Sequence, residues 1–209
     1  MKKAKKTPAK KKSSKKAVPV KATKKAAKKA PSKAAKKPAP KVTPKSMINM
    51  FLKEMEQEAT TTRKFLQIVP EDKWNWKPHE KSMTLQRLAT HVAELPSWAS
   101  MAINTDELDF EASKYIPNLA KTNAELLAVL DKSLADAKAS LKKASDDILS
   151  RTWVMRSGKT IFSKSTKGDV IRMAYCQIVH HRAQLGVYLR LLNIPIPGSY
   201  GPSADDTRF

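Results

Sequence analysis

Residues 169–192, DVIRMAYCQIVHHRAQLGVYLRLL, form the stretch that decides the fold. At about 100° per residue, a stripe of its apolar side chains lies within about 60° of His181 around a helical axis. This spacing predicts an amphipathic helix, with Asp169 as its N-cap and an end before Pro195. The apolar stripe comprises Val170, Ala174, Ile178, Leu185, Tyr188 and Leu192.

A second apolar stripe surrounds His91 in residues 84–102. A core-facing imidazole loses solvation unless something binds it. Two imidazoles on different helices can share one ligand inside a bundle, and a metal ion is the obvious candidate. The alternative for each histidine is a core residue hydrogen-bonded to a backbone carbonyl. The side chains within about 60° of His91 are Leu88, Leu95, Trp98 and Ala102.

Neighbouring polar residues differ in their angular distance from the two stripes. Gln177 precedes His181 by one turn and lies about 40° from it, so it is a candidate third ligand. Glu94 follows His91 by one turn and is a polar rim residue, an additional ligand or a base. His180 lies about 100° off the stripe, which is typical of a flanking residue.

Four long helices with long connections are expected, which predicts an all-α fold of the four-helix-bundle class. The second helix is expected to bend at Pro96, because proline lacks the backbone N–H. Thr122 and Glu125 have the spacing of a capping box at the start of the third helix. The expected helices cover residues 46–69, 84–103, 122–143 and 169–192.

The connections between these helices carry weaker signals. Residues 105–117 are expected to form a loop, and a short helical turn is expected at residues 146–150. Residues 152–168 alternate enough between apolar and polar side chains for a loose hairpin. Trp74 and Trp76, between the first two helices, are expected to cover one end of the core.

Residues 1–45 differ from the rest of the chain in composition. They contain 19 lysines, carry 19 of the 22 net positive charges, and lack acidic, arginine and aromatic residues. Such a segment cannot bury enough apolar surface to offset its chain entropy, so we expect it to be disordered. Residues 46–209 are enough for one domain with one core.

The lysine-rich tail is predicted to bind DNA or RNA, because many positive charges on a flexible chain release counterions condensed on polyphosphate. Lysine supplies point charges that do not read base edges, so this binding is expected to be non-specific. A solubility or anionic-membrane tail is the alternative, although the apolar anchor of stable membrane attachment is missing. The lysines assigned to nucleic-acid binding are Lys2, Lys3, Lys5, Lys6, Lys10, Lys11, Lys12, Lys15, Lys16, Lys24, Lys25, Lys28, Lys29, Lys36 and Lys37.

The single cysteine, Cys176, excludes an intramolecular disulfide framework and favours a reducing compartment. We expect it to be a buried structural thiol on the last helix. No apolar run reaches the length of a bilayer span, and the N-terminus lacks the apolar region of a signal peptide. The protein is therefore expected in the cytoplasm, without a membrane partner and with the nucleoid as a site of association.

Two stretches carry a resemblance to a known family. Residues 69–95, VPEDKWNWKPHEKSMTLQRLATHVAEL, and residues 178–206, IVHHRAQLGVYLRLLNIPIPGSYGPSADD, resemble parts of the DinB/YfiT-like family of metal-dependent four-helix bundles. The likeness extends over residues 46–209 and implies the same fold. By this resemblance, His91 matches the family's first metal ligand, and His181 matches the last ligand of its His-x-x-x-His pair.

The resemblance implies a divalent metal, nickel or zinc, held by three histidines with open positions for water or substrate. Gln177 stands in place of the third histidine, and an amide oxygen is a weaker and harder donor for these metals. The resemblance also implies a homodimer and either hydrolysis or S-transfer from a low-molecular-weight thiol, with no substrate identified. The lysine tail is similar only in composition to the C-terminal tails of linker histones and to bacterial histone-like proteins.

Two alternatives to an enzyme remain open at this point. The first is a non-catalytic, DNA-associated bundle whose metal site is degraded by the presence of Gln177. A structural bundle that dimerises can keep both histidines merely packed in its core.

Overall fold

The computed structural model describes residues 46–113, 116–117 and 119–207. The chain divides into two units, Met1–Pro40 and Lys41–Phe209, and all the described residues belong to the second unit. The lysine-rich tail and its expected disorder therefore lie outside the described residues.

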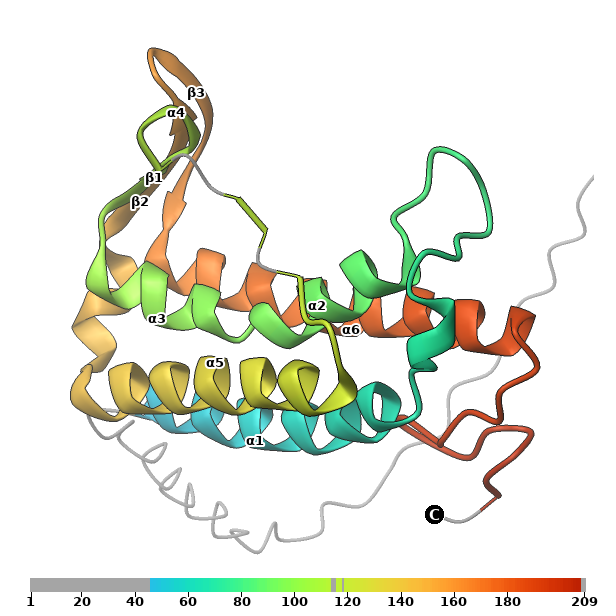
Figure 1. Ribbon diagram of the computed structural model, residues 1–209. Helices are drawn as coiled ribbons and strands as arrows, with labels where there is room; N and C mark the ends of the chain where they lie inside the picture. The colour runs from blue at the N-terminus through green and yellow to red at the C-terminus, as the bar shows by residue number, and fades with distance from the viewer. Residues whose placement is uncertain (1–45, 114–115, 118, 208–209) are drawn as a thin grey trace, which may run out of the picture. The chain divides into compact units, whose positions relative to one another are not determined.

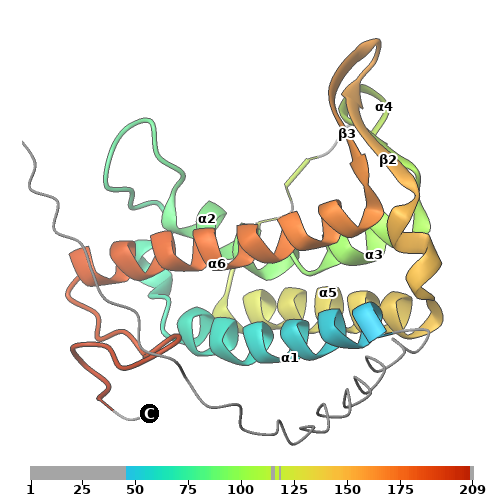
Figure 2. The same ribbon diagram turned by 180° about the vertical axis from the view of Figure 1, so that it is seen from behind.

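Four helical rods form the bundle in the second unit (Figures 1 and 2). Three are single helices: α1 (Ser46–Gln67), α5 (Asn123–Lys143) and α6 (Lys167–Leu191). The fourth rod is built from α2 (Leu85–Glu94) and α3 (Ser97–Asn104), and it contacts both α5 and α6. Among the described residues, no helix combines the length and apolar character needed to cross a membrane.

Pro96 divides the expected second helix into two pieces. Because proline has no N–H, it cannot bond the carbonyl four residues earlier, and α2 ends at Glu94. The Ser97 hydroxyl donates to the Glu94 carbonyl at 2.7 Å and so satisfies a group that the break leaves without a helical partner. The predicted bend is thus a break between two helices.

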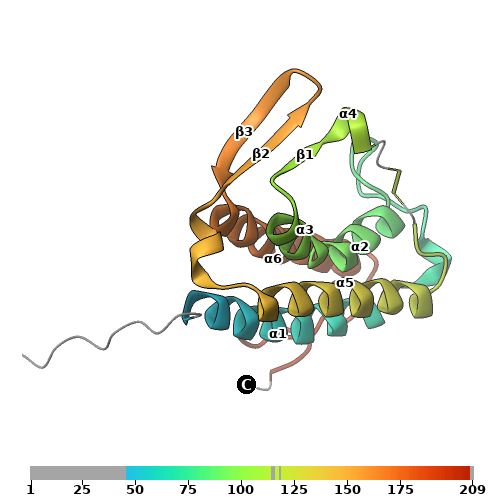
Figure 3. The same cartoon turned by 90° about the vertical axis from the view of Figure 1, so that its left-hand side faces the viewer.

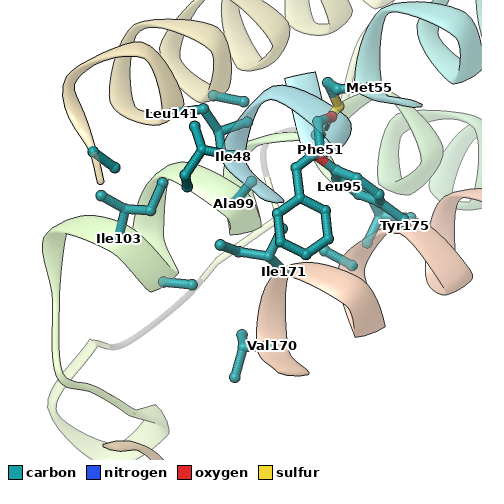
Figure 4. Packing of buried hydrophobic residues seen from close by; sticks show 14 of the residues in the cluster. Ile48, Phe51, Met55, Leu95, Ala99, Ile103, Leu141, Val170, Ile171 and Tyr175 are labelled. Atoms are coloured by element: carbon teal, nitrogen blue, oxygen red, sulfur yellow. Dashed lines mark hydrogen bonds between the residues drawn. The ribbon is translucent and has the colours of Figure 1, made fainter. Parts of the chain in front are cut away.

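The core consists of two clusters of buried side chains along the bundle. In the first cluster, the rings of Phe51 and Tyr175 meet edge to face with centroids 5.7 Å apart (Figure 4). The Tyr175 hydroxyl donates to the Phe51 carbonyl at 2.8 Å, and burial raises the pKa of this phenol. Trp74 and Trp76 pack against the second cluster, as predicted.

A three-stranded sheet extends beyond the bundle (Figure 3) and corrects the all-α prediction. The expected hairpin is present as β2 (Thr152–Ser157) and β3 (Thr160–Thr166), which pair in antiparallel fashion. The expected loop at residues 105–117 instead contains β1 (Glu107–Asp109), parallel to β2, and the single turn α4 (Phe110–Ser113).

Asp109 explains why β1 stays attached to the hairpin. Its Oδ1 accepts the backbone N–H groups of Gly158 and Glu111, both at 3.0 Å, and its Oδ2 lies 2.5 Å from Arg156 Nη1. The Gly158 N–H is the largest cause that holds the pKa of Asp109 below its ordinary value. Gly158 has a φ of 54°, a conformation that favours glycine.

The helix ends are held by side chains from distant and local positions. Thr122 accepts the Glu125 N–H at 3.1 Å at the start of α5, where a cap was expected. The expected helical turn is η2 (Asp146–Ser150), and the Asp146 carboxylate accepts the N–H groups of Met47 and Ile48 at the start of α1. A further short turn, η1 (Glu71–Lys73), follows α1.

The N-cap of α6 is Thr166 and not Asp169, so the sequence-based N-cap is wrong by three residues. The Thr166 hydroxyl accepts the Asp169 N–H, and the Asp169 carboxylate accepts the Thr166 N–H, both at 3.1 Å. This reciprocal capping box places the acidic residue inside the first turn of the helix. Thr166 is also the last residue of β3, so the strand passes directly into the helix.

Candidate metal centre

His91 on α2 and His181 on α6 lie next to each other. Their ring centroids are 4.7 Å apart, and the ring planes meet at 71°. Both histidines are half-buried at the surface of the bundle, so they lie at the rim of the core and not inside it. Two residues 90 positions apart in the chain thus lie side by side, as two ligands of one ion must.

Each imidazole is oriented by a hydrogen bond at Nδ1. The His91 Nδ1–H donates to Glu94 Oε1 at 2.9 Å, and the His181 Nδ1–H donates to the Gln184 side-chain oxygen at 2.8 Å. Because a carboxylate and an amide oxygen can only accept, both imidazoles keep their protons on Nδ1 when neutral. The lone pair then remains on Nε2, which is the atom available to a metal ion.

Arg87 extends this hydrogen-bond chain along α2. Its Nη1 donates to the Glu94 oxygen that also accepts from His91, at 3.1 Å. Arg87 was not among the residues predicted for the site. Its spacing from His91 and Glu94, four and seven residues, places all three on one helical face and was the signal that could have found it.

The pKa of His181 is lowered from its ordinary value, so the neutral imidazole is favoured. Partial burial is the largest cause, and the electrostatic influence of the neighbouring His91, His180 and Arg87 lowers the pKa further. The bond to Gln184 opposes this shift. A neutral imidazole is the form that a metal ion binds.

Gln177, the predicted third ligand, lines the same hollow as His91, one with a volume of about 240 Å³. The side chains of Trp98, Met155 and Met173 also line this hollow. Within residues 46–113, 116–117 and 119–207, no group of three or more His, Cys, Asp and Glu side chains is arranged to hold a metal. The candidate donors that lie near one another are therefore the imidazoles of His91 and His181, with Gln177 beside the hollow that His91 lines. Imidazole nitrogen suits nickel and zinc, and an amide oxygen is a weaker donor for them.

Two other predictions concern residues of α6 near His181. His180 is exposed, as expected for a flanking residue, and its ring centroid lies 4.9 Å from that of His181. Cys176 is exposed, so the prediction of a buried thiol is wrong. The neighbouring Tyr175 takes the place in the core between α1 and α6, and one further residue turns Cys176 about 100° away from it.

Arg182, the residue after His181, was not predicted to be buried or to bind other side chains. Its guanidinium is buried and donates to Glu58 Oε2 at 2.6 Å and to the Thr62 hydroxyl at 3.1 Å. Tyr200 completes the group, because its hydroxyl donates to Glu58 Oε1 at 2.8 Å. This network, which is buried at Arg182, Glu58 and Thr62 and exposed at Tyr200, joins α1, α6 and the segment that follows α6.

The DinB family model matches residues 43–208 of the chain. The chain is 25% identical over 164 residues to the uncharacterized protein YrdA of Bacillus subtilis. This match covers 76% of this chain and 91% of YrdA. It is also similar in fold to the crystal structure of the DinB-like protein YjoA of Bacillus subtilis. The TM-score is 0.56 at 17% identity, over 77% of this chain and 100% of that chain.

A DinB-like protein from Bacillus cereus shows the same likeness, with a TM-score of 0.58 at 18% identity over 73% of this chain and 97% of that chain. These structures support the arrangement of the helices in this chain. Their sequence identity to it is too low to assign an activity. The family model covers most of the sequence, including both histidine-bearing helices. The protein therefore belongs to the DinB family.

Proposed function

We propose that this DinB-family protein binds a divalent metal ion, nickel or zinc, through His91, His181 and Gln177. The two imidazoles would supply Nε2, and Gln177 would supply its amide oxygen. When bound, such an ion polarises a carbonyl or lowers the pKa of a bound water or thiol. The reaction class that fits is hydrolysis, or S-transfer from a low-molecular-weight thiol.

The meeting of His91 with His181 is the observation that carries this proposal. A histidine ligand usually donates its other ring N–H to a carboxylate or carbonyl, which fixes the ring and raises its basicity. The bonds from His91 to Glu94 and from His181 to Gln184 have this form. His91 also lines the hollow that Gln177 lines, so one of the two oriented imidazoles borders a hollow.

The alternative function is a non-catalytic bundle in which Gln177 has weakened the metal site. Gln177 favours this alternative, because an amide oxygen binds nickel and zinc less well than imidazole does. The two functions differ in turnover. If the alternative holds, protein that retains the ion will show no turnover of thiol or ester substrates.

Elemental analysis of the untagged protein tests the metal proposal. We expect close to one nickel or zinc ion per chain after incubation with the metal and removal of the excess. The variants His91→Ala and His181→Ala should lose the ion, whereas His79→Ala, in an exposed turn, should retain it. Retention of no ion by the wild-type protein, or equal retention by all three variants, would overturn the proposal.

We propose in addition that residues 1–45 bind DNA or RNA without sequence preference. The support comes from composition, since this segment carries 19 lysines and no acidic residue. Such a segment would keep the metal-binding bundle close to polyphosphate, with affinity that depends strongly on salt.

A further inference from the structure

A second and larger hollow adjoins His91. Its volume is about 440 Å³, within the range of about 300–1,000 Å³ that is usual for small-molecule sites. His91 and Trp98 line both this hollow and the smaller one that Gln177 lines. Its walls come from α2, α3, β1 and α4, so the unexpected strand and turn of residues 107–113 complete it.

The walls of the larger hollow are apolar and in part aromatic. They include Trp98 and Met101 from α3, Leu108 from β1 and Phe110 from α4. The first three also pack against the first core cluster, which holds them in place without a ligand. Phe110 is 39% exposed, and its ring contacts that of Phe162 on β3 at a centroid distance of 6.2 Å. An apolar wall left open to water in this way favours an apolar occupant.

One end of the larger hollow is polar. Arg87 and Glu94 line it together with His91 and form an ion pair with each other at 3.1 Å. The net charge of this pair is zero, so the hollow does not select for an anionic ligand. A guanidinium has five N–H donors, more than its bond to Glu94 uses, so this end suits a ligand that carries a neutral oxygen acceptor.

We infer that this hollow binds a neutral aromatic molecule of about the size of naphthol, which carries a hydroxyl or carbonyl oxygen. Its ring would lie against Trp98 and Phe110, and its oxygen would accept from Arg87. This deepens the proposed function, because His91 lines the hollow and a molecule held there would lie beside the proposed metal ion. The substrate class is then aromatic and uncharged.

Isothermal titration calorimetry of the full-length protein with 2-naphthol and with 2-naphthoate tests the inferred ligand class. We expect 2-naphthol to bind at least about tenfold more tightly, because the carboxylate of 2-naphthoate would lose its hydration on entering a hollow whose ion pair has no net charge. Equal or tighter binding of 2-naphthoate would overturn the inference of a neutral ligand. Failure of both compounds to bind would overturn the inference of an aromatic ligand.

Three variants place the binding site. Phe110→Ala removes an aromatic wall and should weaken 2-naphthol binding about tenfold. Ser97→Phe adds a side chain at the lining and should abolish binding. Phe162→Ala is the matched control, since Phe162 contacts Phe110 and is itself 58% exposed without lining the hollow. If Phe110→Ala and Ser97→Phe both keep the wild-type affinity and a native circular dichroism spectrum, 2-naphthol does not bind in this hollow.

The metal content of the same samples separates this inference from the proposed function. A protein that binds 2-naphthol in the predicted hollow and retains no nickel or zinc would contradict the proposed function and leave this inference standing. A protein that retains the ion and does not bind 2-naphthol would contradict this inference and leave the proposed function standing.

Discussion

At the scale of single residues, Gln177 governs the strength of the proposed metal centre. It lies one helical turn before His181, and it lines the hollow that His91 lines. Its amide oxygen offers a harder and weaker donor than an imidazole at the same place. The proposed metal centre therefore includes one side chain whose amide oxygen is a weak donor for nickel or zinc.

Gln177→His is expected to raise the affinity for nickel or zinc at least about tenfold, because it replaces the weak donor with an imidazole on the same face of α6. Competition with a chromogenic chelator measures this change. Gln67→His, which adds a histidine at the exposed end of α1, should leave the affinity unchanged. An unchanged affinity in Gln177→His would show that residue 177 does not face the ion.

Arg182 and Glu58 matter to stability and not to the metal. Both are buried, with side chains 2% and 7% exposed, and their oxygen and nitrogen atoms lie 2.6 Å apart. Arg182 also donates to Ser199 and Tyr200, at 3.2 and 3.1 Å. A charge left without its partner at such a position is costly, because the surrounding protein cannot solvate it as water does.

Glu58→Gln is expected to lower the free energy of unfolding by about 3 kcal/mol, because it leaves the Arg182 guanidinium buried without a counter-charge. Urea unfolding followed by circular dichroism measures this loss. Glu56→Gln, which removes an exposed carboxylate that pairs with Lys138, is the matched control and should change the stability little. An equal effect of the two substitutions would contradict the argument.

At the scale of elements, the start of α6 shows how a strand and a helix are joined. Thr166 ends β3 in an extended conformation and caps α6 with its hydroxyl. The buried Lys167 follows, and its ammonium donates to the carbonyls of Ile103 and Thr105 at 3.1 and 2.7 Å. This junction ties the end of α3 to the start of the helix that carries His181.

The capping box at Thr166 makes the stability of α6 depend on pH. Hydrogen bonds from the Thr166 hydroxyl and N–H lower the pKa of Asp169. Its carboxylate therefore stabilises the fold above the ordinary pKa of aspartate, about 4, and this contribution is lost as the pH falls through the lower folded value.

Asp169→Asn is consequently expected to melt below the wild-type temperature at pH 6, with a difference that shrinks as the pH falls from 4 toward 2.5. Differential scanning calorimetry over this range measures it. Thr166→Ala removes the hydroxyl and should cost about 1 kcal/mol at neutral pH. A melting difference that stays constant between pH 6 and pH 2.5 would refute the linkage.

At the scale of the whole molecule, charge is distributed very unevenly along the sequence. Residues 1–45 carry 19 of the 22 net positive charges, and the remaining 164 residues are almost balanced. Metal binding is therefore proposed for the bundle and polyphosphate binding for the lysine-rich tail. Each can be removed by mutation without altering the residues that carry the other.

Removal of residues 1–45 is expected to abolish binding to duplex DNA in a gel-shift assay, because nearly all of the net charge is lost. For the full-length protein, affinity should fall steeply between about 50 and 200 mM salt, since many counterions are released together. Equal shifts by the shortened and full-length proteins would place nucleic-acid binding on the bundle instead.

Local patterns in the sequence were enough to predict the long helices and the hairpin. Apolar spacing within α1, α5 and α6 placed their buried faces, because a helix repeats over a few residues whatever its neighbours are. The same reasoning put His91 and His181 each on its own stripe. It also allowed Pro96 to mark an interruption, though not the two separate helices that the chain forms there.

Tertiary structure alone decided which residues meet. The strand of residues 107–109 exists because it pairs with β2, more than 40 positions away, and three residues are too few for a periodic signal. The burial of Arg182 and the exposure of Cys176 depend on which neighbour α6 packs against at each turn. Sequence determined the faces of the helices because their periodicity is local. The 4.7 Å approach of the His91 and His181 rings depended on packing between separate helices, which no local pattern specifies.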